Sequence, residues 1–495
     1  MSENKNNPVF TFDNSFSRCL EDFFISCQAE PSTYPRLLHF NYALAKDLGL
    51  NSTLLTSKEG LSILSGNLAP GGASPMALAY SGHQFGGFSP LLGDGRALLL
   101  GEVIDVDNNR YDIQLKGSGR TPFSRSGDGK SALGPVLREY LIAEFMHAVG
   151  IPTTRALAAV STGDMVYRTT PLPGGILTRV AASHIRIGTF QYGATLADND
   201  KMRKLADYTM ARHYPEVLSD QNPYLSFFKV VTEAQAFLVA KWMSVGFIHG
   251  VMNTDNIAIS GQTIDYGPCA FMDDYAPGTV FSSIDTQGRY AYANQPLMLS
   301  WNLSRLAETL IPLVHPDQDS AISLLTEAIH TIAPTYERYW LVEMCAKIGI
   351  ANVGLHDLEL INDLLSIMEK QKVDFTLFFS ALSKALSDNS NSIRKLFIDP
   401  LTYEAWAIRW RERLLTEGSP EDDVVKAMNQ VNPSYIPRNH KVEEALSAAV
   451  DNQDLNPFLK LLAIITHPFD EVLGNEPYAQ AAPPSNSPYK TFCGT

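Results

Sequence analysis

The sequence predicts an α+β protein in which a strand-rich first part is followed by a helical second part. Residues 97–104 form an apolar run, and apolar and polar side chains alternate over residues 110–116, as in two neighbouring strands. From about residue 197 the apolar residues recur at helical spacing instead, most clearly over residues 224–247. Prolines interrupt the helical patterns that follow, and we find no repeat of fixed period.

The composition and net charge of the chain indicate which binding partners and which cellular compartment to expect. With 495 residues, 45% of them hydrophobic, the chain can bury one large core or a few smaller ones. A net charge of −14 argues against binding to nucleic acid or to an anionic membrane, so a phosphate site must be a local cluster of Arg and Lys. We find no leader peptide and no apolar run of about 18 residues. Five scattered cysteines fit a reducing compartment, so we expect a cytoplasmic protein.

The region from residue 80 to 116 predicts three strands joined by turns, the first turn bearing glycine. Residues 93–96 (GDGR) lead into the run 97–104, Lys116 stands near the end of the third strand, and a polar loop with Gly127-Asp128-Gly129 follows. Glycine lets backbone N–H groups approach an anion closely, so Lys116 is a candidate phosphate ligand. The alternative is an ordinary surface lysine.

A helix is expected over residues 131–150, with Pro135 in its first turn and Glu139 beside apolar neighbours. An ion pair between Glu139 and Lys116 would hold the lysine charged and aimed at a phosphate, whereas a half-exposed surface glutamate is the alternative. A hairpin with its turn at residues 161–164 is expected next. Arg179 and Arg186 then interrupt apolar runs, so each must face solvent, pair with a carboxylate or bind an anion.

The segment 247–275 (FIHGVMNTDNIAISGQTIDYGPCAFMDDY) concentrates the polar candidates. We expect a hairpin between Asn256 and Asp265, with its turn at residues 260–262, that fixes the distance between them. The side-chain oxygens of Asn and Asp are hard ligands that suit Mg²⁺ or Mn²⁺ bound to phosphates. The alternative is a polar hairpin without a metal.

The order of these candidates is that of the parts of a protein kinase: a strand Lys, a helix Glu, an Asn, then Asp-aromatic-Gly. Residues 249–251 (HGV) stand where a kinase has His-Arg-Asp, so the usual catalytic carboxylate is absent.

Over nearly its whole length the sequence resembles the selenoprotein O (YdiU-type) pseudokinases. The resemblance rests on long collinear motifs: QFGGFSPLLGDGRA, QLKGSGRTPFSRSGDGKSALGPVLREYL, HGVMNTDN, DYGPCAFMD and NPSYIPRNH, together with a Cys near the C-terminus. It implies a protein-kinase-like two-lobed fold with terminal extensions. The corresponding divisions are an N-terminal extension (1–75), an N-lobe (76–185), a C-lobe with the metal and catalytic loop (186–300), a helical region (301–480) and a flexible tail (481–495).

The resemblance also implies an activity: transfer of AMP from ATP, bound in a flipped orientation, to Ser, Thr or Tyr hydroxyls of target proteins, with Mg²⁺ or Mn²⁺. We expect a monomer. It assigns Asp255 as the proton acceptor, Asn256 and Asp265 as metal ligands, and Glu139 as the partner of Lys116. The residues implied to line the nucleotide site are Gly93, Gly95, Arg96, Lys116, Asp128, Gly129, Arg179 and Arg186.

Three other functions remain open from the sequence: transfer of UMP from UTP with Mn²⁺, phosphate transfer, and an inactive nucleotide-binding scaffold. The absent His-Arg-Asp carboxylate disfavours phosphate transfer, and the intact Lys116, Asn256 and Asp265 disfavour the scaffold. The resemblance further implies a redox-sensitive disulfide between Cys269 and Cys493, the latter at the place where some members carry selenocysteine. Two unpaired thiols are the alternative.

Overall fold

The computed structural model describes residues 9–387, 391–483 and 489–492. Its centre is an eight-stranded antiparallel sheet with the order β1-β3-β6-β7-β10-β9-β2, in which β8 pairs with β10. The strands of this sheet are β1 (Phe24–Ser26), β2 (Arg36–Phe40), β3 (Met76–Leu78), β6 (Ala97–Ile104), β7 (Arg110–Lys116), β8 (Ser131–Ala132), β9 (Arg155–Tyr167) and β10 (Pro171–Ala181). Two small sheets lie apart from it: β4 (Gly82–Gln84) with β5 (Gly87–Ser89), and β11 (Phe247–Ile248) with β12 (Ala270–Phe271).

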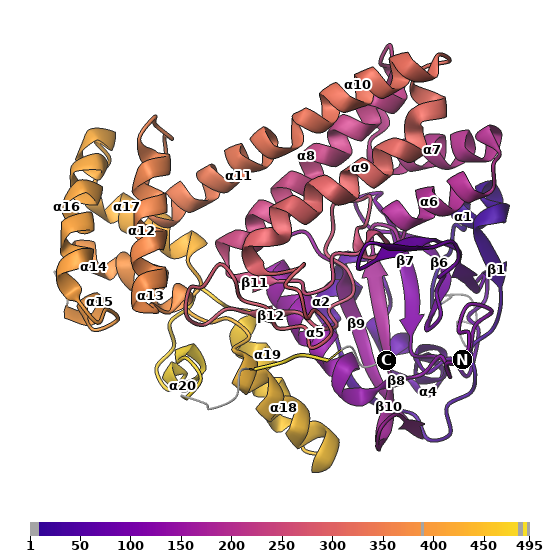
Figure 1. Cartoon of the computed structure of the whole chain (residues 1–495). Helices are drawn as coiled ribbons and strands as arrows, with labels where there is room; N and C mark the ends of the chain where they lie inside the picture. The colour runs from indigo at the N-terminus through magenta and orange to yellow at the C-terminus, as the bar shows by residue number, and fades with distance from the viewer. Residues whose placement is uncertain (1–8, 388–390, 484–488, 493–495) are drawn as a thin grey trace.

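Helices cover both faces of the main sheet and extend well beyond it (Figure 1). The helices before residue 250 are α1 (Ser15–Cys19), α2 (Tyr42–Asp47), α3 (Ser52–Leu55), α4 (Lys58–Leu64), α5 (Leu133–Ala148), α6 (Ile187–Thr195), α7 (Asn199–His213) and α8 (Pro223–Ser244). Those after it are α9 (Gln295–Val314), α10 (Gln318–His330), α11 (Ile332–Lys347), α12 (Asp357–Gln371), α13 (Phe375–Leu382), α14 (Lys384–Ser387), α15 (Asn391–Arg394), α16 (Pro400–Glu417), α17 (Glu421–Val431), α18 (Asn439–Asp451), α19 (Asn456–Ile465) and α20 (Glu476–Ala479). In Figure 1, α6 to α10 lie above the sheet, and α11 leads away to a separate group formed by α12 to α17.

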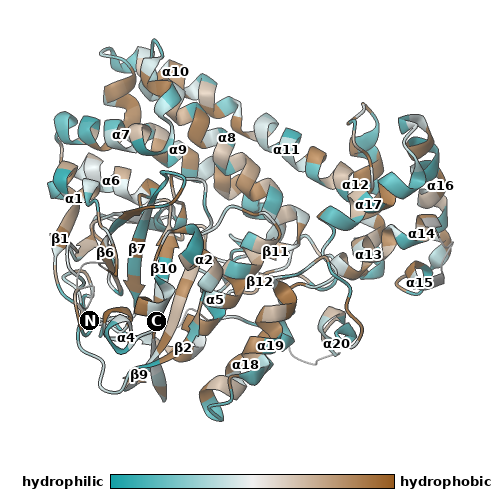
Figure 2. Cartoon of the chain, turned by 180° about the vertical axis from the view of Figure 1, so that it is seen from behind, coloured by the Kyte–Doolittle hydropathy of each residue, from teal (hydrophilic) through white to brown (hydrophobic). Residues whose placement is uncertain are grey.

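The two faces of the sheet bury different sets of side chains. Because side chains alternate along a strand, β7 turns Ile113 and Leu115 to one face, where they pack with residues of α2 to α4. Gln114 and Lys116 point to the opposite face, which α5 covers with Leu137 and its neighbours. In Figure 2 the helices α7 and α10 carry both hydrophobic and hydrophilic residues, as expected for helices with one buried side. The polar face of β7 thus lies beneath α5, where the candidate site forms.

Several predicted elements are confirmed. The strands expected over residues 97–104 and 110–116 are β6 and β7, and the helix expected over 131–150 is α5, two residues shorter at each end. The long helix expected over 224–247 is α8. The mixed α/β composition is therefore as predicted. No helix in the described ranges is both long enough and apolar enough to cross a bilayer.

The two predicted hairpins are wrong. β9 runs straight through residues 161–164, because it pairs with β10 beyond that point, and the chain turns at 168–170 instead. The arms of the expected 256–265 hairpin do not pair with each other: Ala258 bridges Arg186, and Thr263 bridges Thr153. A turn does form there, since the Gly261 N–H donates to the Ala258 carbonyl (3.1 Å). Asn256 and Asp265 are thus held by other parts of the chain.

Candidate active site

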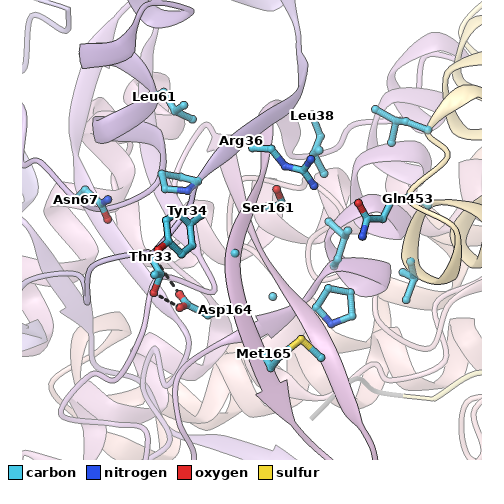
Figure 3. Close-up of a pocket in the computed structure, with 18 of the residues that line it drawn as sticks. Thr33, Tyr34, Arg36, Leu38, Leu61, Asn67, Ser161, Asp164, Met165 and Gln453 are labelled. Atoms are coloured by element: carbon cyan, nitrogen blue, oxygen red, sulfur yellow. Dashed lines mark hydrogen bonds between the residues drawn. The ribbon is translucent and has the colours of Figure 1, made fainter.

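A cavity of about 660 Å³ between the main sheet and the 247–275 segment gathers the predicted site residues. Its lining includes Gly93, Gly95, Arg96, Lys116, Asp128, Gly129, Glu139, Arg179, Arg186, Asp255, Asn256 and Asp265. A somewhat larger cavity, of about 780 Å³, lies beside β2 and the β9–β10 ribbon and is shown in Figure 3. Among the described residues, the charged ones that line it are Arg36, Lys58 and Asp164, and Asp164 is bonded to Thr33. The first cavity is lined by many more ionisable side chains, so it is the candidate active site.

Lys116 is held between two carboxylates at the end of β7. Its Nζ lies 2.6 Å from Glu139 Oε2 on α5 and 2.6 Å from Asp265 Oδ1. Glu139 is buried, and the Lys116 side chain is 17% exposed, so the ammonium group stays within reach of the cavity. The ion pair expected between these two residues is present in the structure, and Asp265 joins it.

Two arginines complete the cluster from β10 and the start of α6. Arg179 Nη1 lies 2.7 Å from Asp265 Oδ1 and 3.1 Å from Glu139 Oε1, and its Nε donates to Gln114 Oε1 (3.1 Å) on the neighbouring strand. Arg186 Nη1 donates to Asp265 Oδ2 (2.7 Å) and to the Asp255 carbonyl (2.6 Å). Solvent exposure of these guanidinium groups, the alternative left open by the sequence, is therefore wrong: both are almost fully buried.

Asp265 is the centre of this charge cluster. Burial by itself would raise its pKa, but the three surrounding cations outweigh burial and hold the pKa well below its ordinary value. Its backbone is left-handed (φ 63°), a conformation that costs free energy for any residue with a side chain. The carboxylate is thus kept ionised and fixed in direction, with its side chain 21% exposed to the cavity.

Asp255 lies beside the cluster in a different environment. It is 8% exposed, and its Oδ1 is a buried oxygen with no hydrogen-bond partner among the described residues. Gln84 Nε2 lies 3.4 Å from the other oxygen. Burial raises the pKa of Asp255 to about 6, although Arg186 acts in the opposite direction. A carboxylate with a pKa near neutrality and one uncommitted oxygen suits a proton acceptor.

The two predicted metal ligands, Asn256 and Asp265, both present side-chain oxygens to the cavity region. Asn256 donates from Nδ2 to the Val251 carbonyl (3.0 Å), and no bond to its side-chain oxygen is present in the part of the chain that the structure describes. With the Asp265 carboxylate it supplies hard oxygens, which fit Mg²⁺ or Mn²⁺. In the described ranges no group of three or more His, Cys, Asp or Glu could hold a metal ion. The residues therefore fit a divalent cation that takes its remaining ligands from phosphate and water.

The glycine-rich loops also line the cavity. Gly129 has φ +69°, and a Cβ there would lie 2.0 Å from the Gly119 carbonyl oxygen, so the loop closes only with glycine at this position. Asp128 lies next to it and forms an ion pair with Arg168 (2.9 Å), whose hydrogen bond is the main reason that the pKa of Asp128 is lowered.

Sequence reasoning missed several residues of the site. Asp94 is buried and bonds Gln114 (3.2 Å), Arg168 holds Asp128, and Gln84 reaches Asp255. The signal for Asp94 was its place between two turn glycines, but nothing local marks Gln84 or Arg168. They reach the site through pairings between segments far apart in the sequence.

Cys269 lies just beyond the cavity and is fully buried. The tail passes close by, because Thr491 Oγ1 donates to the Pro268 carbonyl (2.7 Å) and residue 491 bridges Ser282. Cys493 lies outside the described residues, and no disulfide joins two cysteines within them.

With this geometry established, the chain was compared with known proteins. A family model described as protein adenylyltransferase SelO matches residues 9–466. The chain belongs to the SelO family. Membership places it among the nucleotidyltransferases.

Curated relatives in the SelO family match end to end. Proteins named protein nucleotidyltransferase YdiU are 56% identical in Cereibacter sphaeroides (strain KD131), over 98% of this chain and 100% of the relative, and 53% identical in Rhizobium rhizogenes, over 99% and 97%. The relative in Rhizobium meliloti is 51% identical over 98% of this chain and 100% of its own length.

Proposed function

We propose that this SelO-family nucleotidyltransferase transfers AMP from ATP to Ser, Thr or Tyr hydroxyls of target proteins. The observation that carries the proposal is the cluster of Lys116, Arg179 and Arg186 around a single cavity-facing carboxylate. In a chain of net charge −14 such a concentration of cations favours a polyanion, and a triphosphate fits a cavity of about 660 Å³. In this proposal ATP binds in the flipped orientation that the family resemblance implies.

The proposed reaction has one bond made and one broken. The target hydroxyl oxygen bonds to the α-phosphorus, the bond from that phosphorus to the bridging oxygen breaks, and pyrophosphate leaves. The hydroxyl proton passes to Asp255, whose unpartnered Oδ1 lies in the cavity wall. Lys116 and the two arginines would bind phosphate oxygens and stabilise charge that develops on pyrophosphate.

Asn256 and Asp265 would hold the divalent cation, which when bound neutralises charge on the phosphates. Because Asp265 already contacts three cations, a metal must compete with them for its oxygens. Arrival of the triphosphate relieves this competition, since Lys116 and the arginines then have phosphate oxygens to bind. Metal and nucleotide are therefore expected to bind together.

The two-lobed arrangement is likewise a proposal. Lys116, Glu139 and Arg179 come from the sheet and α5, whereas Asp255, Asn256 and Asp265 come from the 247–275 segment that follows α8. This supports a cleft between an N-lobe at 76–185 and a C-lobe at 186–300, followed by the helical region 301–480 and the tail. The segment 1–75, named as an extension, supplies the outer strands β1 and β2 to the sheet.

The test is transfer from ATP labelled separately on the α- and γ-phosphates, with Mg²⁺ or Mn²⁺ and a mixture of proteins as acceptors. Label from the α position alone supports AMP transfer, label from the γ position indicates a kinase, and absence of both indicates a scaffold. α-Labelled UTP in parallel tests UMP transfer.

The matched variants for this test are Asp265→Asn and Asp422→Asn, the second on the exposed first turn of α17. We expect Asp265→Asn to lose at least 100-fold in transfer, on the order of removing a key electrostatic contact, while circular dichroism shows an intact fold. Asp422→Asn should match the parent. Retained transfer in Asp265→Asn would remove the metal and phosphate roles given to this residue.

A redox disulfide between Cys269 and Cys493 is proposed as a restraint on the same site. It is supported by the contact of Thr491 with Pro268, which brings the tail to the residue before Cys269. Peptide mapping of oxidised protein without reductant should recover the two cysteines in one linked pair. Separate alkylation of both thiols under oxidant would contradict it.

A further inference from the structure

The small sheet of β4 and β5 lies directly on the segment that carries Asp255. The His83 N–H donates to Thr254 Oγ1 (2.7 Å), and the Phe85 N–H donates to Asn253 Oδ1 (3.1 Å). Between these two, the side chain of Gln84 reaches Asp255 Oδ2 (3.4 Å). Three consecutive residues of the hairpin, 83–85, thus contact three consecutive residues of the 247–275 segment, 253–255.

The packing at this contact is close. A Cβ at Gly82 would lie 2.5 Å from Asp255 Oδ1, so the first residue of β4 lies against the oxygen proposed to accept the proton. The hairpin therefore borders the part of the cavity wall that holds this oxygen. An acceptor hydroxyl that approaches Asp255 Oδ1 comes close to the hairpin, so the polypeptide around that hydroxyl can meet the outer surface of the hairpin.

That outer surface carries rings that a protein of this kind ordinarily buries. Phe85 is 39% exposed and Phe88 is 48% exposed. Phe88 lies against His83 (centroids 4.8 Å apart), which in turn lies against Trp301 (5.2 Å). Phe85 packs on Tyr290 (5.1 Å) and has left-handed backbone (φ 51°) at the tip of the hairpin. Strain and exposure of an aromatic residue together point to a use outside folding.

A cation completes the surface. The Arg289 guanidinium stacks on Trp301 (4.7 Å to the ring centroid) and lies beside Gly86 at the hairpin tip. It has no ion pair with a carboxylate in the described ranges, and its buried Nε has no hydrogen-bond partner there. We call Phe85, Phe88, Trp301 and Arg289 the hairpin platform. Only Phe85 among them lines the nucleotide cavity, so the platform extends beyond the space for nucleotide.

We propose that the hairpin platform binds the polypeptide segment that carries the acceptor hydroxyl. An apolar side chain next to the hydroxyl would cover Phe85 and Phe88, and a carboxylate of the same segment would pair with Arg289. The proposal rests on protein hydroxyls being the acceptors. It selects among targets by the residues that flank the hydroxyl, because burial of one apolar side chain is worth about tenfold in affinity or more.

The test uses three synthetic peptides with one Ser each, flanked by Gly only, by Leu, or by Leu and Asp, together with α-labelled ATP. The parent protein should modify the Leu-flanked peptide with a KM about tenfold below that of the Gly-flanked one, and the peptide with Asp should be better still. Phe88→Ser should raise the KM for the Leu-flanked peptide to that of the Gly-flanked one without changing the KM for ATP. Arg289→Gln should remove only the advantage of Asp.

Leu415→Ser is the matched control, since Leu415 is 81% exposed on the distant helix α16 and its loss should leave the flank preference intact. Transfer to all three peptides with equal KM, or a preference that survives in both Phe88→Ser and Arg289→Gln, would overturn the platform. Absence of α-label transfer to any peptide or protein would instead overturn the proposed function, and the platform with it.

Discussion

Asp255 and Asp265 show how neighbours decide the role of a buried carboxylate. Burial by itself would raise the pKa of both, yet three cations lower the pKa of Asp265, whereas the pKa of Asp255 rises to about 6 because burial dominates there. The first residue stays ionised and can hold a cation. The second can take up and release a proton near neutral pH, which separates the two roles within one cavity.

This difference predicts how pH affects activity. If Asp255 accepts the hydroxyl proton, kcat/KM should fall about tenfold for each unit of pH below about 6. Asp255→Asn should be inactive at every pH. A profile that stays flat down to pH 5 would contradict the assignment of Asp255 as the base.

The same shift predicts a stability change of opposite sign to the activity change. The ordinary pKa of Asp255 is 3.8, so between pH 3.8 and about 6 the folded chain keeps a proton that the unfolded chain has lost. The free energy of unfolding therefore falls as pH rises through this window, by about 3 kcal/mol in total. Asp255→Asn should be more stable than the parent at pH 7 and equal to it below pH 4 in urea unfolding. The exposed Asp422→Asn should show no such gain.

At the scale of elements, the loop between β7 and α5 depends on backbone geometry that only glycine provides. Gly129 and Gly150, at the two sides of α5, have nearly the same left-handed φ (+69° and +73°), but only Gly129 lacks room for a Cβ. Alanine substitutions at the two positions therefore separate two free-energy costs: that of a left-handed backbone, which both share, and that of the steric clash, which only Gly129 has.

Gly129→Ala should therefore weaken ATP binding by about tenfold or more, because the loop must move away from the Gly119 carbonyl to admit the methyl group. Gly150→Ala should lose only the stability that a left-handed alanine costs, about 1 kcal/mol, and should bind ATP as the parent does. Isothermal titration calorimetry with ATP and Mg²⁺ measures both. Equal binding by the two variants would show that the Gly129 loop does not shape the nucleotide site.

At the scale of the whole molecule, sequence reasoning succeeded where structure is set locally. The strands β6 and β7 and the helix α5 were predictable because side-chain periodicity is a local property. The 256–265 hairpin was not, because its arms bridge Arg186 and Thr153 across the fold. The site divides in the same way. Its motif residues were foreseeable, but Gln84 reaches Asp255 only through tertiary packing, which no spacing in the sequence reveals.

The C-terminal helical region reaches back to the 247–275 segment through Arg438 and Asn439. Arg438 is 1% exposed and pairs with Asp273 (2.6 Å) and Asp374 (2.7 Å), while Asn439 Nδ2 donates to the Phe271 carbonyl (2.8 Å) in β12. These contacts explain the NPSYIPRNH motif, for which the sequence alone offered no structural role. They hold the stretch that follows Asp265, up to residue 273, against the C-terminal helices.

Arg438→Met should therefore destabilise the protein by about 3–5 kcal/mol, because it leaves the buried Asp374 without its cation. Hydrogen exchange followed by mass spectrometry should show faster exchange in peptides covering residues 268–275, and nucleotide transfer should fall with it. The matched control is Arg409→Met, whose ion pair with Asp363 is exposed on both sides and is worth at most about 1 kcal/mol. Unchanged exchange over 268–275 in Arg438→Met would mean that this part of the 247–275 segment keeps its structure without the contacts of Arg438.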